Sequence, residues 1–360
     1  MHPMNTPSKV WFTPLKDKQS SETTALAALK LAEAAGLKAL AGHGRLVGIL
    51  QHVGEGRNIG HIKPAITRAL AAKLTALKAK PFLTGSATLY KGRRSNAVDH
   101  MMQAYEHGFT PEAIGCPIIM SDGLRGGDRI AVKVPRAKHC RTAYLGSAVG
   151  MMDSLLVVSH PTGHIAAGFG ATIKNVSMGL ADRGGKMAMH FGGHPIFNAA
   201  KCTACGRCAQ WCPVDAIVIG KKATLTQAKC IGCGQCLSMC AFDAIGFEWG
   251  TNSEVFQERL VEYCAAVKER IGERILYLNI CQQFTPECDC FDLLQKPVCP
   301  DIGILASYDP VAIDKATIDL LNQAAGRDLV QEIGKRGYEA LFAHAEKIGL
   351  GSRAYQLKTI

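Results

Sequence analysis

Eight cysteines in the middle of the chain are the residues best suited to chemistry. They form two runs, Cys202 to Cys212 and Cys230 to Cys240, and each run has the spacing C-x2-C-x2-C-x3-C. Thiolates at this spacing hold four-iron four-sulfur clusters, because three close cysteines surround one face of a cubane and a more distant cysteine completes the set. Such clusters accept and deliver single electrons, so the sequence predicts redox chemistry.

The fourth ligand of each cluster is predicted to come from the other run, as in two-cluster bacterial ferredoxins. The ligands then divide into Cys202, Cys205, Cys208 and Cys240 for one cluster and Cys230, Cys233, Cys236 and Cys212 for the other. The segments after the runs, PVDAI at 213–217 and AFDAI at 241–245, are similar and indicate an internal duplication. Structural zinc is the alternative, but a site of two CxxC pairs leaves the third cysteine of each run without a role.

A second group of candidate residues follows a predicted strand. His160 and His164 are four residues apart, and Gly168 to Gly170, Lys174 and Asn175 come after them. Histidines and glycines at the carboxyl end of a strand suit the binding of an anion or a metal. The alternative is a pair of packed loop histidines bound to main-chain carbonyls, and these residues alone favour it.

The remaining candidate residues are the cysteines outside the two runs and the histidines of residues 190–194. Cys288-Asp289-Cys290 cannot form a cubane loop, but its thiolates could bind a metal together with a histidine or act as redox groups. Buried, unreactive thiols are the alternative for the late cysteines Cys281, Cys288, Cys290 and Cys299. Residues 190–194, HFGGH, are interpreted as a hinge rather than as metal ligands. Packing roles are expected for Cys116, Cys140 and Cys264.

The elements that must position these residues alternate between strands and helices, which implies an open α/β sheet flanked by helices. Before the cysteine runs, strands are predicted at 9–12, 45–53, 81–84, 117–120, 129–134 and 155–159, and helices at 22–35 and 64–78. After the runs come a helix at 253–271, a strand at 274–280 and a helix at 310–324. Residues 1–197 and 252–360 are therefore expected to form two parts of one α/β domain. An α+β ferredoxin-like module, residues 198–251, is expected to interrupt it.

Composition narrows the class of protein. The chain of 360 residues has 48% hydrophobic residues, yet no segment approaches the ~20 apolar residues that span a bilayer. The amino terminus has no apolar signal-peptide core, which favours a cytoplasmic protein, and cluster thiolates favour a reducing, low-oxygen compartment. The formal net charge is +11, but the basic residues are scattered. A solvated surface is the first interpretation, docking of an acidic redox partner the second, and nucleic acid the last.

Long motifs in the chain resemble the iron–sulfur branch of the domain-of-unknown-function 362 family. They are RSNAVDH at 94–100, GFTPEAIGCPIIMSDGLRGGD at 108–128, SHPTGHIAAGFGATIKNVSMG at 159–179, the two cysteine runs, CDC at 288–290 and PDIGILASYDPVAID at 300–314. The resemblance implies an α/β domain with a ferredoxin insert that carries two 4Fe-4S clusters. The residues on matching motif positions are His164, Lys174, Asn175, Cys288 and Cys290.

The chain also departs from the family pattern. Leu50 stands where a lysine is common, Gly85 and Ala87 stand where aspartate and asparagine are common, and Pro161 and Thr162 replace an aromatic residue and a lysine. The loss of several polar groups from loops that should meet in one cleft indicates altered or abandoned chemistry there.

Two functions from different classes follow. The first is a ferredoxin-type electron carrier with a large docking domain, which the intact ligand set and the depleted cleft favour. The second is an oxidoreductase whose clusters exchange electrons with a substrate or second cofactor near His164, Lys174 and Cys288, the candidate catalytic residues. An additional metal or substrate site is a further hypothesis, with candidate ligands His160, His164, Asn175, Cys288 and Cys290. No phosphate-binding glycine motif is present, so a nucleotide is unsupported and a flavin stays open.

Overall fold

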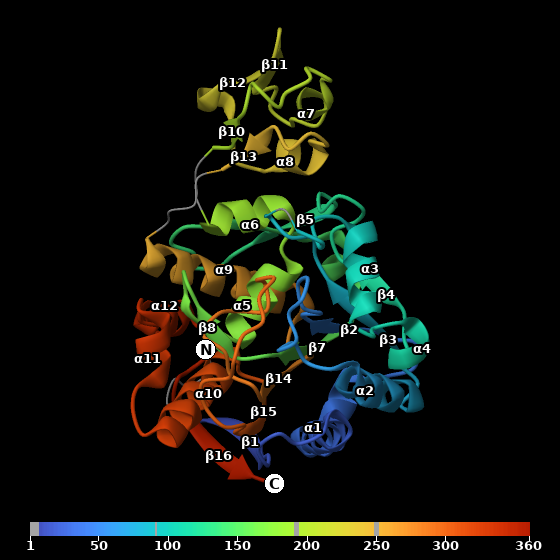
Figure 1. Ribbon diagram of the computed structural model, residues 1–360, viewed down its shortest axis with the longest axis vertical. Helices are drawn as coiled ribbons and strands as arrows, with labels where there is room; N and C mark the ends of the chain where they lie inside the picture. Colours follow the sequence, from blue (N-terminus) through green and yellow to red (C-terminus); the bar gives the residue numbers. More distant parts are fainter. Residues whose placement is uncertain (1–6, 91, 191–193, 248–251) are drawn as a thin grey trace.

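A single mixed sheet organises the larger part of the molecule. The computed structural model describes residues 7–90, 92–190, 194–247 and 252–360. Eight strands lie in the order β16-β1-β15-β14-β7-β2-β3-β4, and all run parallel except β15, which is antiparallel to both neighbours (Figure 1). Their bounds are β1 (Ser8–Pro14), β2 (Leu46–Gln51), β3 (Lys80–Gly85), β4 (Ile118–Met120), β7 (Ser154–Ser159), β14 (Ile275–Cys281), β15 (Gly303–Ser307) and β16 (Tyr355–Thr359).

Helices cover both faces of this sheet. One face carries α1 (Ser21–Ala35), α2 (Pro64–Ala76) and α4 (Pro111–Ile114), and the other carries α5 (Thr172–Leu180), α9 (Ser253–Ile271), α10 (Pro310–Ala325) and α12 (Glu339–Ile348). Strand β7 is therefore buried on both faces. Leu155 and Val157 belong to one hydrophobic core, and Leu156 and Val158 belong to the other. A central parallel strand is buried on both faces in this way and is apolar throughout.

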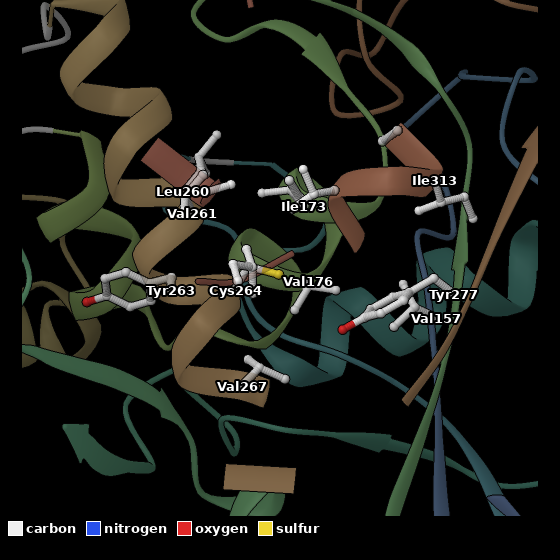
Figure 2. Close-up of a cluster of buried hydrophobic side chains, with 14 of the residues drawn as sticks. Val157, Ile173, Val176, Leu260, Val261, Tyr263, Cys264, Val267, Tyr277 and Ile313 are labelled. Carbon is white, nitrogen blue, oxygen red and sulfur yellow. The ribbon is translucent and has the colours of Figure 1, made fainter. Parts of the chain in front are cut away.

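The core on the sheet face that carries α5, α9, α10 and α12 is built largely from α9 and α5. Figure 2 shows Cys264 of α9 next to Val176 of α5, and Tyr277 of β14 beside Val157 of β7. Cys264 is fully buried among apolar side chains, and burial raises its thiol pKa well above the usual value. Its role here is packing, as expected from the sequence.

The predicted open α/β sheet is confirmed, and its strands come from both sides of the cysteine-rich segment, since β14 lies between β7 and β15. One strand was predicted in the wrong place. Strand β5 (Arg129–Lys133) pairs only with β6 (Thr142–Gly146), outside the main sheet. Its sequence, RIAVK, carries a charge at each end and is only partly buried, which does not suit a central parallel strand.

The remaining elements are shorter. They are η1 (Leu37–Leu40), α3 (Ala97–Glu106), η2 (Ser147–Met151), β8 (Thr162–His164), β9 (Gly168–Gly170), α6 (Arg183–His190) and α11 (Leu329–Gly334). Among the described residues, none of the helices combines the length and apolar character needed to cross a membrane.

Residues 194–247 form a small body beyond α6, at the top of Figure 1. It contains β10 (Ile196–Phe197), α7 (Arg207–Gln210), β11 (Ile217–Ile219), β12 (Ala223–Leu225), η3 (Gln227–Lys229), α8 (Gln235–Met239) and β13 (Ile245–Gly246). Strand β10 pairs with β13 and β11 with β12, around a separate core that includes Ile217, Leu237 and Ile245. We call this body, residues 194–247, the cysteine module. The proposed hinge at 191–193 and the return at 248–251 lie outside the described residues.

Candidate functional site

The cysteines of the module surround two separate hollows. One hollow is lined by Cys202, Cys205, Cys208 and Cys240, and the other by Cys212, Cys230, Cys233 and Cys236. The structure thus brings together the same two sets of four that the spacing predicts, each with one cysteine from the opposite run.

Main-chain amides point at several of these sulfurs. The N–H groups of Ala204 and Ala223 donate to Cys202 Sγ at 3.4 and 3.3 Å. The N–H groups of Ala216, Gly232 and Ala244 donate to the sulfurs of Cys212, Cys230 and Cys240 at 3.2, 3.4 and 3.3 Å. Hydrogen bonds of this kind stabilise the negative charge of cluster-bound thiolates, so the donor set fits two iron–sulfur clusters.

Within the part of the chain that the structure describes, no three or more His, Cys, Asp or Glu side chains converge to hold one metal ion. A cubane differs in its requirement, because each thiolate binds a different iron and the four sulfurs need not meet at one point.

The α/β domain contains a cavity of about 550 Å³ at the carboxyl ends of β2 and β3. Parallel sheets characteristically bind ligands at this edge, and pockets of this size hold small-molecule substrates. Its wall includes Leu50 to His52 at the end of β2, Gly85, Ser86 and Thr88 to Tyr90 at the end of β3, Arg94, His100, residues of α5 and α6, and the loop that carries Cys288 and Cys290.

Cys290 lies at the centre of a buried network on this wall. Lys174 Nζ donates to Cys290 Sγ at 3.3 Å, and His52 Nε2 lies 3.6 Å from the same sulfur. A hydrogen bond with Cys288 lowers the pKa of Cys290 well below its usual value, and Lys174 and His52 lower it further. The same bond raises the pKa of Cys288. The pair therefore consists of a thiolate at Cys290 and a protonated thiol at Cys288.

The donors around Cys290 are held in position by the main chain. The N–H of Gly54 donates to His52 Nδ1 at 3.0 Å, so the neutral ring carries its proton on Nε2, toward the thiolate. Lys174 belongs to α5, whose first turn is capped by Asp314 of α10. The Asp314 carboxylate accepts the N–H groups of Thr172 and Ile173, both at 2.9 Å. The PDIGILASYDPVAID motif thus orients the helix that carries Lys174.

His160 does not line the cavity, although the sequence grouped it with the candidate ligands. Its Nδ1 lies 2.9 Å from Asp289 Oδ2 and its Nε2 lies 2.8 Å from the carbonyl of Gln282. Burial opposes the charges of this pair, but mutual attraction prevails, so the pKa of His160 is raised and that of Asp289 is lowered to about 2. His160 is a positioning residue that orients the loop carrying both cavity thiols.

His164, Lys174, Asn175, Cys288 and Cys290 do lie together on the cavity wall. The N–H groups of Ala166 and Ala167 donate to His164 Nδ1 at 3.2 and 3.0 Å, which places the proton of the neutral ring on Nε2. Burial, together with the charge of Lys174, lowers the pKa of His164 to about 3. The imidazole is therefore a neutral hydrogen-bond donor at physiological pH.

The wall also contains functional residues that the sequence reasoning did not select. Arg94 Nε pairs with Glu55 Oε2 at 2.9 Å, and its guanidinium donates to the Tyr90 hydroxyl at 2.6 Å. His100 and Lys186 complete this side. Arg94 and His100 stand at the two ends of the RSNAVDH motif, which could have identified them. No comparable sequence signal pointed to Lys186.

The cavity and the cysteine module share a wall. Helix α6 contributes Lys186 and His190 to the cavity, while its first turn touches the loop of Cys233. A Cβ at Gly184 would lie 1.9 Å from the Cys233 carbonyl, and a Cβ at Gly234 would lie 2.4 Å from Gly184 Cα, so both glycines are required for this approach. Arg129 fixes the contact by donating to the Cys233 carbonyl at 2.7 Å.

Leu89 belongs to the cavity wall and also to the hydrophobic cluster of the cysteine module. This cluster also includes Met187, Cys208 and Cys236. The interpretation of residues 190–194 as no more than a hinge misses this arrangement, because His190 faces the cavity.

The positions that depart from the family pattern do not all line the cavity. Leu50 and Gly85 do, whereas Ala87 and Thr162 are buried elsewhere. The late cysteines also divide into two pairs. Cys281 and Cys299 pack in or against the main core, whereas Cys288 and Cys290 face the cavity. The cleft is far from depleted, because basic residues, histidines and thiols occupy most of its polar wall.

Comparisons with known proteins place the chain in a family. Residues 47–319 match the family model described as domain of unknown function (DUF362). No curated protein matches. Similar solved structures include the lactate racemase apoprotein from Thermoanaerobacterium thermosaccharolyticum, with a TM-score of 0.40 and 11% identity over 74% of this chain and 50% of that one. Another is a Thermotoga maritima protein from a structural genomics consortium, with a TM-score of 0.42 and 11% identity over 87% of this chain and 61% of that one.

The chain spans 50% and 61% of the lengths of those two structures. The family match covers most of the chain, since it starts in β2 and ends within α10. It includes the cavity thiols, the eight cysteines of the module and the motifs that position α3 and α5. The chain therefore belongs to the DUF362 family, a family named for a domain of unknown function.

Proposed function

We propose that the protein is an iron–sulfur electron-transfer protein of the oxidoreductase class, with two 4Fe-4S clusters in its cysteine module and a substrate site in the cavity of its α/β domain. The observation that supports the proposal is the division of eight cysteines between two hollows. Five main-chain amides point at four of the sulfurs, and two of these amides point at Cys202. Such clusters, when bound, supply one-electron transfer.

The contact between the module and α6 favours an enzyme over a carrier with an idle docking domain. Gly184 touches the Cys233 loop, and His190 lines the cavity six residues later. Six residues of α-helix rise about 9 Å, so the module lies within a short distance of the cavity wall. A carrier has no need to place its ligand loop so close to an enclosed site.

The cavity residues can bind a substrate and move protons. Cys290 is a half-buried thiolate that can act as a nucleophile or accept a proton, and the Cys288 thiol beside it can return one. His164, with its proton on Nε2, can donate a hydrogen bond to a substrate oxygen. Apolar side chains of Leu50, Leu89 and Met178 exclude water from the same space.

An acidic redox partner protein is the proposed electron donor or acceptor. Basic side chains cluster around the first cysteine run and its hairpin: Lys201, Arg207, Lys221, Lys222 and Lys229. All five are exposed. Charge complementarity of this kind speeds the encounter of two proteins and falls with ionic strength.

The test of the proposal is anaerobic purification followed by iron, sulfide, nickel, zinc and flavin analysis and a reductive titration. Iron and sulfide in equal amounts, an electron paramagnetic resonance signal after dithionite, and uptake of two electrons are the expected results. A preparation without sulfide, or zinc in place of iron, would contradict it. A third chromophore would identify a second cofactor in the cavity.

A variant of the cavity separates enzyme from carrier. Replacing His164 with alanine should leave iron and sulfide unchanged and alter substrate-dependent reoxidation of the reduced protein. The matched control is His43→Ala, on a different part of the chain and outside the cavity wall. If His164→Ala and His43→Ala reoxidise like the parent with every substrate that the parent uses, the carrier function replaces the enzyme.

A further inference from the structure

The cavity wall is basic and contains no described acidic side chain. Its ionisable residues are Arg94, Lys174 and Lys186, four histidines, Tyr90 and the two thiols. Among the residues that the structure places on this wall there is no aspartate and no glutamate. A closed space with this composition favours an anionic ligand, since buried positive charge is costly unless an anion neutralises it.

Two of the three cations are already neutralised. Arg94 pairs with Glu55, which lies behind the wall, at 2.9 Å. Lys174 donates to the Cys290 thiolate at 3.3 Å, and although burial lowers its pKa, the nearby thiols and Asp289 raise that pKa overall. These two cations therefore stabilise the site itself.

Lys186 is different because its ammonium contacts only uncharged oxygens. It donates to Ser86 Oγ and to the carbonyl of Ala181, both at 2.6 Å, and no ion pair of Lys186 occurs among the described residues. Burial lowers its pKa to about 8, while the more distant Asp122 and Asp182 act in the opposite direction. These two carboxyls are themselves buried, and burial raises their pKa values to about 6 and about 7. Lys186 is thus the cation on the wall that lacks a firm counterion.

His100 supplies a second unused group at the same end of the cavity. It is 6% exposed, and in the described structure its Nδ1 has no hydrogen-bond partner. Burial keeps the ring neutral by lowering its pKa, and the charges of Arg94 and Lys186 add to this effect. A neutral imidazole can carry its proton on Nδ1 and donate it to an acceptor. A buried nitrogen without a partner is costly and indicates a group that a ligand satisfies.

The lining also includes the apolar side chains of Leu50, Leu89, Ile165, Met178 and Phe291. We propose that the cavity binds an organic carboxylate, with its acid group between the Lys186 ammonium and the His100 imidazole and its apolar body against Leu50, Leu89 and Met178. One free cation and one neutral donor match a singly charged carboxylate, whereas a phosphate dianion needs more positive charge. This inference deepens the proposed function, because it names the class of substrate for the same site.

Gly85 has no side chain and leaves open space beside His100. Gly85 ends β3 on the cavity wall, and a Cβ there would lie 3.8 Å from His100 Cε1, an ordinary contact distance. A carboxylate carried by the chain at this position would therefore occupy the anion site. Glycine at this position leaves the site open for a carboxylate from a ligand.

The test uses a pair of probes and a pair of variants on the full-length protein, purified anaerobically. The probes are 2-naphthoate and its neutral amide, 2-naphthamide, and binding is measured by titration calorimetry. We expect naphthoate to bind at least about tenfold more tightly than naphthamide, since a charge-assisted hydrogen bond is worth roughly this factor. The variant Lys186→Met should abolish the preference, while the exposed Lys80→Met should retain it.

Gly85→Asp and Gly85→Asn provide a test that does not depend on removing a buried lysine. The two side chains have the same size, so only Gly85→Asp adds a negative charge beside His100. Naphthoate should bind Gly85→Asp at least about tenfold more weakly than Gly85→Asn. Equal affinity for the two variants, equal affinity of the parent for both probes, or no naphthoate binding at millimolar concentration would overturn the inference. Iron and sulfide analysis is independent of these affinities, so a failure of the iron–sulfur proposal is recognised separately.

Discussion

The molecule contains two sets of clustered cysteines, one in the module and one on the cavity wall, and the two sets are built by different means. The eight cysteines of the module are close neighbours in sequence, and main-chain amides from the same loops point at their sulfurs. Cys288 and Cys290 instead depend on side chains from distant segments, since Lys174, His52 and His160 belong to three other parts of the chain. Local spacing specifies the first set, and tertiary packing specifies the second.

The two sets also differ in the groups that stabilise a thiolate charge. In the module, thiolate charge is met by peptide dipoles, which cannot be titrated or removed by a side-chain mutation. In the cavity, the charge of Cys290 is met by Lys174 and polarised by Cys288, both of which can be replaced one at a time. The two sets should therefore respond differently to the same kind of substitution, and the following experiments measure that difference.

The largest effect is expected from removal of a ligand in the module. Cys202→Ala and Cys230→Ala should each lose one cluster and retain about half of the iron and sulfide, because the two cysteines line different hollows. Cys264→Ala, at a buried packing cysteine, should retain all of it. Retention of the full iron content by either ligand variant would disprove the division into two sets of four.

A large effect confined to the cavity is expected from Lys174→Met. Loss of the ammonium raises the pKa of Cys290, and each unit of increase lowers its thiolate fraction about tenfold at a pH below that pKa. The rate at which iodoacetamide alkylates Cys290 at pH 7, followed by mass spectrometry, should fall at least about tenfold. Lys80→Met should leave that rate unchanged. An unchanged rate in Lys174→Met would show that Cys288 alone sustains the thiolate.

An intermediate effect is expected from Asp289→Asn, which leaves His160 buried without its carboxylate. The loss should be about 3 kcal/mol in the free energy of unfolding of the α/β domain. The pKa of Asp289 is lowered to about 2, so its contribution is present above its usual pKa and is lost as the pH falls toward 2. The pKa of His160 is raised, so its contribution is present below about 6.5 and is lost at higher pH.

The difference between Asp289→Asn and the parent should therefore be greatest between about pH 4 and pH 6.5. Urea unfolding followed by circular dichroism at pH 6 and pH 9 measures it. Asp292→Asn is the control, since this exposed carboxylate on the same loop pairs with exposed Arg57 and contributes little. A pH-independent difference would mean that packing, and not the ion pair, orients the loop.

The smallest effect is expected from Lys222→Met in the module. Lys222 is exposed and donates to the Cys202 carbonyl, so its charge favours the added electron only weakly. The reduction potential should fall by an amount on the order of tens of millivolts, and less at high salt. Lys30→Met, on the surface of α1, should leave the potential unchanged. A shift as large as that from loss of a buried charge would contradict the dominance of peptide dipoles at this cluster.

Most of the secondary structure followed from local patterns. The helix predicted at 253–271 agrees with α9, and Pro64 begins α2 as its position at a helix start indicates. Buried parallel strands such as β7 and β14 were found because they are continuously apolar. The error at β5 has the same origin, since strand propensity identifies an extended segment but not the sheet that it joins.

The cavity was predicted only in fragments. The motif around His164 and Lys174 and the CDC pair were recognised, and the structure places four of the five proposed ligands together while it moves His160 behind the loop. No role was predicted for His52 from the sequence. Lys186 was missed because no sequence signal pointed to it, and His100 was missed although it ends the RSNAVDH motif. Their proximity arises only when α3 and α6 pack at the ends of β2 and β3.

The sequence alone determined which cysteines of the module lie together, because the short spacing brings three cysteines of one run close and the opposite run supplies the fourth. It also determined the order of strands and helices, which local periodicity encodes. Only the tertiary structure decided that Cys290 is a thiolate, that His160 supports it from behind, and that Lys186 and His100 face an open space. Those properties depend on burial and on charges brought together across the sheet, and neither is encoded in any single segment.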